Sequence, residues 1–207
     1  MIMKDKIYYV MDPMCGWCYG FSEVIQKLYK NYKEKYDFEL VPGGMWTEGS
    51  IKVLDQELGQ YIKSHNSRIE AMTGAKFGKG FNQLLDSKEE HILDSFPGSH
   101  AVTIVNEMDK DKSFAYMAQV QKSFFQEGLD VRNPELYFQI AQNLGLDIEQ
   151  FKAHWQESQM VEKTKSQFSK ARKLSSTGYP SLILEKNKQL KQIAAGYTAY
   201  SNIANLL

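Results

Sequence analysis

The sequence predicts an α/β protein in which a long helical segment interrupts one mixed sheet. Two observations support this prediction: short apolar runs typical of strands occur only towards the two ends of the chain, and the periodic segments from about residue 50 to residue 175 all have helical spacing. The expected order is strand, helix, strand, then the helical segment, then two strands and a helix. We therefore expect residues 1–48 and 176–207 to form one discontinuous sheet domain, with residues 49–175 as an inserted helical subdomain.

The N-terminal piece has the pattern of a crossover unit. Residues 7–11 are apolar and aromatic and precede Asp12-Pro13, which is typical of a buried strand and its end. Apolar residues then recur at helical spacing over residues 21–32, and a second strand is predicted at residues 38–41. A strand, helix, strand unit of about 35 residues favours parallel pairing of its two strands.

Capping signals mark helices in the inserted segment. Asn133-Pro134 supplies an N-cap and a first-turn proline for a helix that stops at Gly145. Asp147 and Gln150 have capping-box spacing ahead of another helix. Glycines and prolines divide the first part of the segment into short pieces. Apolar spacing alone predicts two more helices, at residues 114–125 and 160–171.

The strand pattern returns near the C-terminus. A predicted loop at residues 176–180 leads into a β-hairpin, which a last helix follows. The predicted elements are a strand at residues 181–185, a turn at residues 186–188, a strand at residues 189–195, and an amphipathic helix at residues 200–207 capped by Thr198.

Composition excludes several classes of protein. The chain has 207 residues, of which 43% are hydrophobic, and its 25 basic and 25 acidic side chains balance, so net charge gives no reason to expect nucleic acid or a membrane as partner. The N-terminus lacks the apolar stretch of a secretory signal, and charged residues interrupt every apolar run before the roughly 20 residues of a membrane span. If the chain is complete, we expect it in the cytoplasm. No oligomeric state is predicted.

The two cysteines form the motif Cys15-Gly16-Trp17-Cys18, at the predicted junction of the first strand and the first helix. At a helix N-terminus, unpaired backbone N–H groups stabilise a thiolate, which is the reactive form of cysteine. The spacing brings the second sulfur within disulfide reach of the first. Cys15, expected to be the more exposed, would attack a substrate disulfide, and Cys18 would resolve the mixed disulfide.

Two other roles for the cysteine pair are less favoured. Structural cysteines have no reason to stand at this spacing and this junction. A structural zinc site needs four ligands, and the chain has no second cysteine pair. The histidines lie in the inserted segment without His-x3-His spacing: His65, His91, His100 and His154. We therefore predict redox chemistry and no metal.

These motifs, with Gly178-Tyr179-Pro180 at the start of the hairpin, resemble the DsbA family of thioredoxin-fold proteins, and in particular its cytosolic branch of protein-disulfide-isomerase-like and FrnE-like proteins. The resemblance covers nearly the whole chain. It implies a thioredoxin fold with a helical insertion, Cys15 and Cys18 as the redox pair, and a cis Tyr179–Pro180 bond. In such proteins the cis-proline loop lies against the disulfide and binds the incoming substrate.

The resemblance also implies the function, a thiol–disulfide oxidoreductase that exchanges with protein or small-molecule disulfides and thiols. The active-site neighbours would be Pro13, Gly16 and Trp17. No bound cofactor is expected, and glutathione is a candidate reductant or co-substrate. Exported oxidases of this fold have a histidine between the cysteines. Gly16 and Trp17 supply no cation, so we expect a more reducing couple.

Two alternatives remain open at this point. One is a glutathione-dependent transferase or isomerase of the kappa-class or hydroxychromene carboxylate isomerase type, but those relatives generally use a serine near the position of Cys15. The other is a non-catalytic redox-sensing interaction protein.

Two carboxylates near the motif and two aromatic residues are assigned structural roles and not roles in the active site. Asp12 and Glu23 are interpreted as surface carboxylates, so no proton acceptor is identified for Cys18. Trp46 and Phe96 are interpreted as core residues and not as neighbours of the disulfide.

Overall fold

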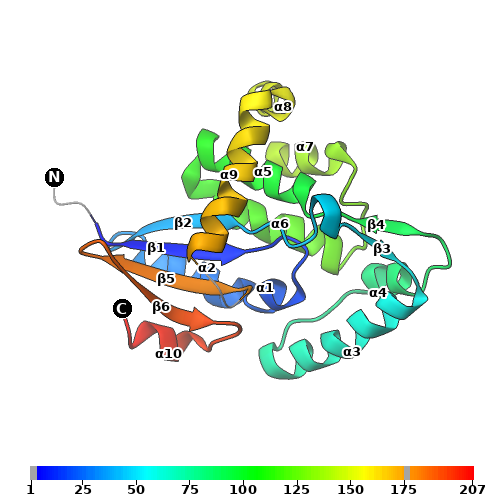
Figure 1. Cartoon of the computed structure of the whole chain (residues 1–207), viewed down its shortest axis with the longest axis horizontal. Coiled ribbons are helices and arrows are strands. Elements are labelled where there is room, and N and C mark those ends of the chain that lie inside the picture. The colour runs from blue at the N-terminus through cyan, green and yellow to red at the C-terminus, as the bar shows by residue number, and fades with distance from the viewer. Residues whose placement is uncertain (1–3, 175–177) are drawn as a thin grey trace.

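The computed structural model describes residues 4–174 and 178–207. Within this part of the chain, one mixed sheet has the strand order β2-β1-β5-β6, with β1 parallel to β2 and antiparallel to β5 (Figure 1). Strands β5 and β6 form the antiparallel hairpin. The mixed sheet predicted from the sequence is therefore confirmed. The strands are β1 Lys6–Met11, β2 Asp37–Pro42, β5 Ser181–Lys186 and β6 Gln189–Ala195.

Alternation along β1 explains how both faces of the sheet are covered. Tyr9 belongs to the main hydrophobic core and contacts Phe21 and Phe114, at the start of α2 and on α6. Tyr8 points to the other face, where a smaller cluster includes Ala171 of α9. In Figure 1, α9 crosses this face of the sheet. The helices outside the insertion are α1 Gly16–Gly20, α2 Ser22–Tyr32 and α10 Tyr200–Ala204.

The inserted segment is mainly helical, as predicted. Two short 3-10 turns lie within it, at Glu48–Ser50 and Lys110–Lys112. Residues 175–177, where the sequence analysis places the end of the insertion and part of the predicted loop, lie outside the described residues. The helices of the segment are α3 Gln56–Thr73, α4 Lys79–Leu85, α5 Phe96–Met108, α6 Ser113–Phe125, α7 Pro134–Asn143, α8 Ile148–Gln156 and α9 Ser158–Leu174.

The insertion also contains a small sheet that the sequence analysis did not predict. Strand β3, Lys52–Leu54, pairs antiparallel with β4, His91–Leu93. The expectation that every periodic segment here is helical was therefore wrong. Strands of three residues are too short for an alternating pattern, and these two lie far apart in the sequence, so no turn links them locally.

The predicted caps within the insertion are confirmed. The Asn133 side chain accepts a hydrogen bond from the Glu135 amide, and the Asp147 side chain accepts from the Glu149 and Gln150 amides. The cap predicted for the last helix was wrong, because α10 begins after Ala199 without a side-chain cap, and the Thr198 hydroxyl instead contacts the Gly196 carbonyl.

No helix among residues 4–174 and 178–207 has both the length and the apolar character needed to cross a membrane.

Candidate active site

The cysteine motif lies where β1 ends and α1 begins. Cys15 is the N-cap residue of α1, and its amide donates a hydrogen bond to the Asp12 carbonyl, which closes the turn after the strand. Cys15 is 8% exposed, whereas Cys18 in the same helix is fully buried, and both thiols are free. The expected difference in exposure between the two cysteines is thus observed.

The loop before β5 lies against Cys15. The Cys15 thiol donates to the Tyr179 carbonyl oxygen at 3.8 Å, and the Tyr179–Pro180 peptide bond is cis. The Tyr179 hydroxyl donates to the Gly43 carbonyl at 2.9 Å, and a Cβ at Gly43 would lie only 2.2 Å from the Tyr179 ring. Gly178 has a positive φ of 95°. Glycine at position 43 therefore lets the ring hold this loop beside the cysteines.

Cys18 has a buried, polar surrounding. Burial is the main cause that raises the pKa of Cys18 well above its ordinary value. A hydrogen bond to Cys15 and the charges of Cys15 and Asp12 raise this pKa further. A backbone hydrogen bond from Asp12 acts in the opposite direction. Tyr9 is also fully buried and its side chain hydrogen-bonds to Cys18, which leaves the pKa of the tyrosine well above its ordinary value. Cys18 therefore keeps its proton at neutral pH.

Asp12 is fully buried, so its interpretation as a surface carboxylate was wrong. Its carboxylate accepts hydrogen bonds from the Met14 amide at 2.9 Å, the Met45 amide at 2.6 Å and the Ser95 hydroxyl at 2.8 Å. Burial raises the pKa of Asp12 to about 6, although these three donors act in the opposite direction. Glu23 is exposed, as expected.

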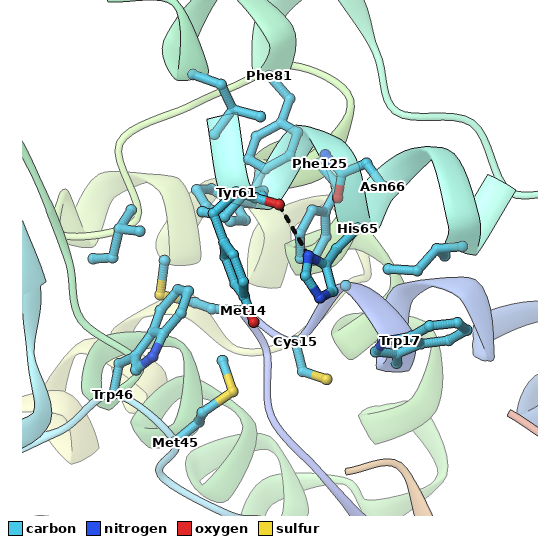
Figure 2. Close-up of a pocket in the computed structure, with 16 residues that line it drawn as sticks. Met14, Cys15, Trp17, Met45, Trp46, Tyr61, His65, Asn66, Phe81 and Phe125 are labelled. Carbon is cyan, nitrogen blue, oxygen red and sulfur yellow. Dashed lines mark hydrogen bonds between the residues drawn. The ribbon is translucent and has the colours of Figure 1, made fainter. Parts of the chain in front are cut away.

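A cavity of about 410 Å³ opens beside Cys15 (Figure 2). One wall comes from the cysteine motif and the loop after β2, and the opposite wall comes from helix α3. Close approach of α3 to the motif requires small residues, since a Cβ at Gly16 would lie 3.0 Å from Ile69 and one at Gly20 only 2.8 Å from it. The lining residues are Met14, Cys15, Gly16, Trp17, Met45, Trp46, Tyr61, Ile62, His65, Asn66, Ile69, Phe81, Leu85, Leu93, Phe124 and Phe125.

The cavity contains site residues that the sequence analysis missed. Figure 2 shows Tyr61 and His65 of α3 beside Cys15, with Nδ1 of His65 3.0 Å from the Tyr61 carbonyl oxygen. Nothing in the sequence signals them, because their proximity to Cys15 depends on how α3 packs. Trp46 also lines the cavity, contrary to its interpretation as core alone.

The other predicted neighbours are distributed around the motif. Trp17 lines the cavity, and the Arg68 guanidinium lies 5.8 Å from its ring centroid. Pro13 is buried against Gly98, where an added Cβ would be 3.0 Å from the proline ring. Phe96 lies away from the cavity and is stacked on His100, but it is only half-buried and not a core residue.

Among the residues that the structure describes, no three His, Cys, Asp or Glu side chains lie together in a way that could hold a metal ion.

Comparison with known proteins now identifies the family. A sequence model of the family described as Thioredoxin matches residues 8–204. The chain belongs to the thioredoxin family. The resemblance drawn from the cysteine motif and the hairpin loop is thereby confirmed, and so is the fold class.

Solved structures of this fold match over nearly the full length. A candidate protein disulfide isomerase from Nitrosomonas europaea has a TM-score of 0.86 and 25% identity, covering 98% of this chain and 95% of that one. The cytosolic disulfide reductase DsbM from Pseudomonas aeruginosa has a TM-score of 0.79 and 27% identity, covering 97% and 96%. DsbM has also been solved with GSH.

A curated relative is more distant. The ClpXP adapter protein SpxH from Halalkalibacterium halodurans is 21% identical over 150 residues, which make up 71% of this chain and 47% of SpxH. The chain therefore spans about half the length of this curated relative.

Proposed function

We propose that the protein is a thiol–disulfide oxidoreductase that uses Cys15 and Cys18 as its redox pair. The observation that supports this most directly is the difference between the two sulfurs of one helical turn: Cys15 is at the N-terminus of α1 on the edge of an open cavity, and Cys18 is fully buried. Family membership and the similar disulfide isomerase and reductase structures support the same enzyme class.

The reaction begins with the Cys15 thiolate, which attacks one sulfur of a substrate disulfide. A Cys15–substrate disulfide forms, the substrate disulfide breaks, and the released thiolate takes up a proton. Cys18 then loses its proton and displaces the bound substrate sulfur, so that a Cys15–Cys18 disulfide forms. Two electrons pass from the protein to the substrate. The Tyr179–Pro180 loop, whose carbonyl faces the Cys15 sulfur, would position the substrate.

Asp12 is the proposed proton acceptor for Cys18. The resolving step requires loss of a proton from a thiol whose pKa is raised by burial, in a place without free access to water. Asp12 is hydrogen-bonded to Cys18 through its backbone and carries a carboxylate whose pKa is about 6. A base with a raised pKa is better matched to a thiol proton than an ordinary carboxylate.

Turnover requires an external reductant, and we propose glutathione or a similar thiol for this role. Support comes from the similarity to DsbM, a cytosolic disulfide reductase solved with GSH, which also favours the reducing direction and a cytoplasmic location. The chemistry needs neither a bound metal nor an organic cofactor, because the two thiols supply both electrons.

The test is insulin reduction with glutathione as reductant, comparing the wild type with Cys15→Ala and Cys18→Ala. Loss of the attacking thiol should reduce the rate to that of glutathione alone. Loss of the resolving thiol should instead leave a mixed disulfide on Cys15 that mass spectrometry detects. Equal rates in all three proteins would exclude exchange through this pair.

A non-catalytic adapter role is the second candidate, because the curated relative is a ClpXP adapter protein. Under this alternative, the same assay gives no rate above glutathione alone in any of the three proteins. The alternative of a glutathione-dependent transferase or isomerase has weaker support. The hydroxychromene carboxylate isomerase structure is 14% identical to this chain, which shows a shared fold only.

A further inference from the structure

The cavity beside Cys15 is larger than sulfur exchange requires. Exchange itself involves three sulfur atoms, whereas a volume of about 410 Å³ lies within the range of small-molecule binding sites. Since the Cys15 residue lines this space, a substrate bonded to its sulfur can extend directly into it. The shape and chemistry of the cavity therefore determine how favourably the group attached to that sulfur binds.

The walls of the cavity are mostly aromatic and aliphatic. Trp17 and Trp46 lie near Cys15, and Phe81, Phe124 and Phe125 form the inner part. No Lys, Arg, Asp or Glu of the described part of the chain lines the cavity. The polar lining other than Cys15 itself comes from three residues of α3, Tyr61, His65 and Asn66, and Nδ1 of His65 already contacts the Tyr61 carbonyl.

We infer that this cavity binds the group attached to the sulfur that Cys15 attacks, and that it selects a bulky, uncharged aromatic group. An aromatic ring gains free energy when it leaves water for such a site. The carboxylates and the ammonium of a glutathionyl group would instead lose hydration, and the lining offers them no Lys, Arg, Asp or Glu side chain as a charged partner. The inference rests on the proposed function, because it concerns the substrate of that exchange.

This selection decides which half of an unsymmetrical disulfide stays on the protein. Cys15 attacks the sulfur that bears the aromatic group, the Cys15–sulfur bond forms, and the original disulfide breaks. The other half leaves as a thiolate and takes up a proton. With glutathione as the second half, glutathione is released and the aromatic thiol remains bound until Cys18 displaces it.

The test uses the Cys18→Ala variant and the mixed disulfide of glutathione with 2-naphthylmethanethiol. Mass spectrometry of the protein distinguishes the naphthylmethyl adduct from the glutathionyl adduct. The same variant unfolded in urea gives the intrinsic ratio of attack on the two sulfurs. In the folded protein, we expect the ratio to rise about tenfold or more in favour of the naphthylmethyl adduct.

Two substitutions in the Cys18→Ala background provide the control. Ile62→Trp fills the cavity from α3 and should return the ratio to its value in urea. Gln60→Trp adds the same bulk to an exposed position of α3 outside the cavity and should leave the ratio unchanged. If Ile62→Trp does not fold, a competition experiment on the Cys18→Ala protein takes its place. Added 2-naphthalenemethanol, which has no sulfur, should occupy the cavity and slow formation of the naphthylmethyl adduct.

The outcomes separate the inference from the proposed function. Adducts in the same ratio in the folded and the unfolded protein would overturn the inference, while exchange through Cys15 would stand. Absence of both adducts on the folded protein would overturn the proposed function itself. A second arm, with the mixed disulfide of glutathione and the dipeptide amide Cys-Trp, identifies the source: retention of the dipeptide indicates a protein substrate, and retention of only the naphthylmethyl group indicates a small one.

Discussion

Asp12 shows the limit of sequence reasoning for a single residue. An aspartate before proline at the end of a strand is typical of a surface turn, which is how the sequence analysis interpreted it. Its burial depends on donors that are distant in the sequence, the Met45 amide and the Ser95 hydroxyl. The cysteines, by contrast, were predictable because their spacing and position are local features. A motif can therefore identify the sulfurs, but it does not identify the buried groups around them.

The first prediction concerns the pH dependence that Asp12 gives to stability. Burial raises its pKa from 3.8 to about 6, so the folded protein binds this proton more tightly than the unfolded chain. The free energy of unfolding should therefore fall as the pH rises from about 4 to about 6, by about 2 kcal/mol from this group. Asp12→Asn removes the titrating group. We expect the stability of the wild type relative to this variant to decrease across that window in urea titrations.

An exposed carboxylate supplies the control for this measurement. Glu34 lies on the surface just after α2, so Glu34→Gln should change the free energy of unfolding by no more than about 0.5 kcal/mol at either end of the pH range. A constant difference between wild type and Asp12→Asn over the same range would mean that Asp12 does not titrate there. If Asp12 also accepts the Cys18 proton, Asp12→Asn should slow release of the mixed disulfide without slowing its formation.

Helix α3 shows that local sequence patterns also fail to predict which element packs against the active site. Caps at Asn133 and Asp147 were predictable because an N-cap involves residues only two or three apart. Helix α3 lies in the part of the insertion that glycines and prolines divide, and its packing over Gly16 depends on tertiary structure. The sequence therefore predicted the helical character of the insertion, but it did not predict which helix completes the site.

The second prediction compares two N-caps. The Asp55 side chain caps α3 by accepting from the Leu58 amide at 2.8 Å, and Asp147 caps α8, whose residues do not line the cavity. Alanine at either position should lower stability by about 1 kcal/mol. A loss of this size changes the population of a frayed first turn about fivefold. Only Asp55→Ala should therefore lower the naphthylmethyl to glutathionyl adduct ratio, as measured in the Cys18→Ala background. Equal ratios in the two variants would show that the start of α3 does not shape the cavity.

At the scale of the whole molecule, the sheet and the insertion share one hydrophobic core. Tyr9 of β1 belongs to the same cluster as Tyr137 of α7 and Phe151 of α8. The sequence predicted a sheet domain and an inserted subdomain from the order of patterns along the chain. Periodicity identifies which face of an element is buried, but it does not identify the partner against which that face packs.

The last prediction follows from this shared core. If sheet and insertion stabilise each other, they should unfold in a single transition. Two variants provide local probes: Trp17→Phe with Trp46→Phe leaves Trp155 of α8 as the only tryptophan, and Trp46→Phe with Trp155→Phe leaves Trp17 beside the cysteines. In each variant, urea midpoints from tryptophan fluorescence and from far-UV circular dichroism should coincide. Loss of the Trp155 signal at lower urea than the dichroism signal would instead mean that the insertion unfolds independently, so that the cavity wall could open while the cysteine pair stays folded.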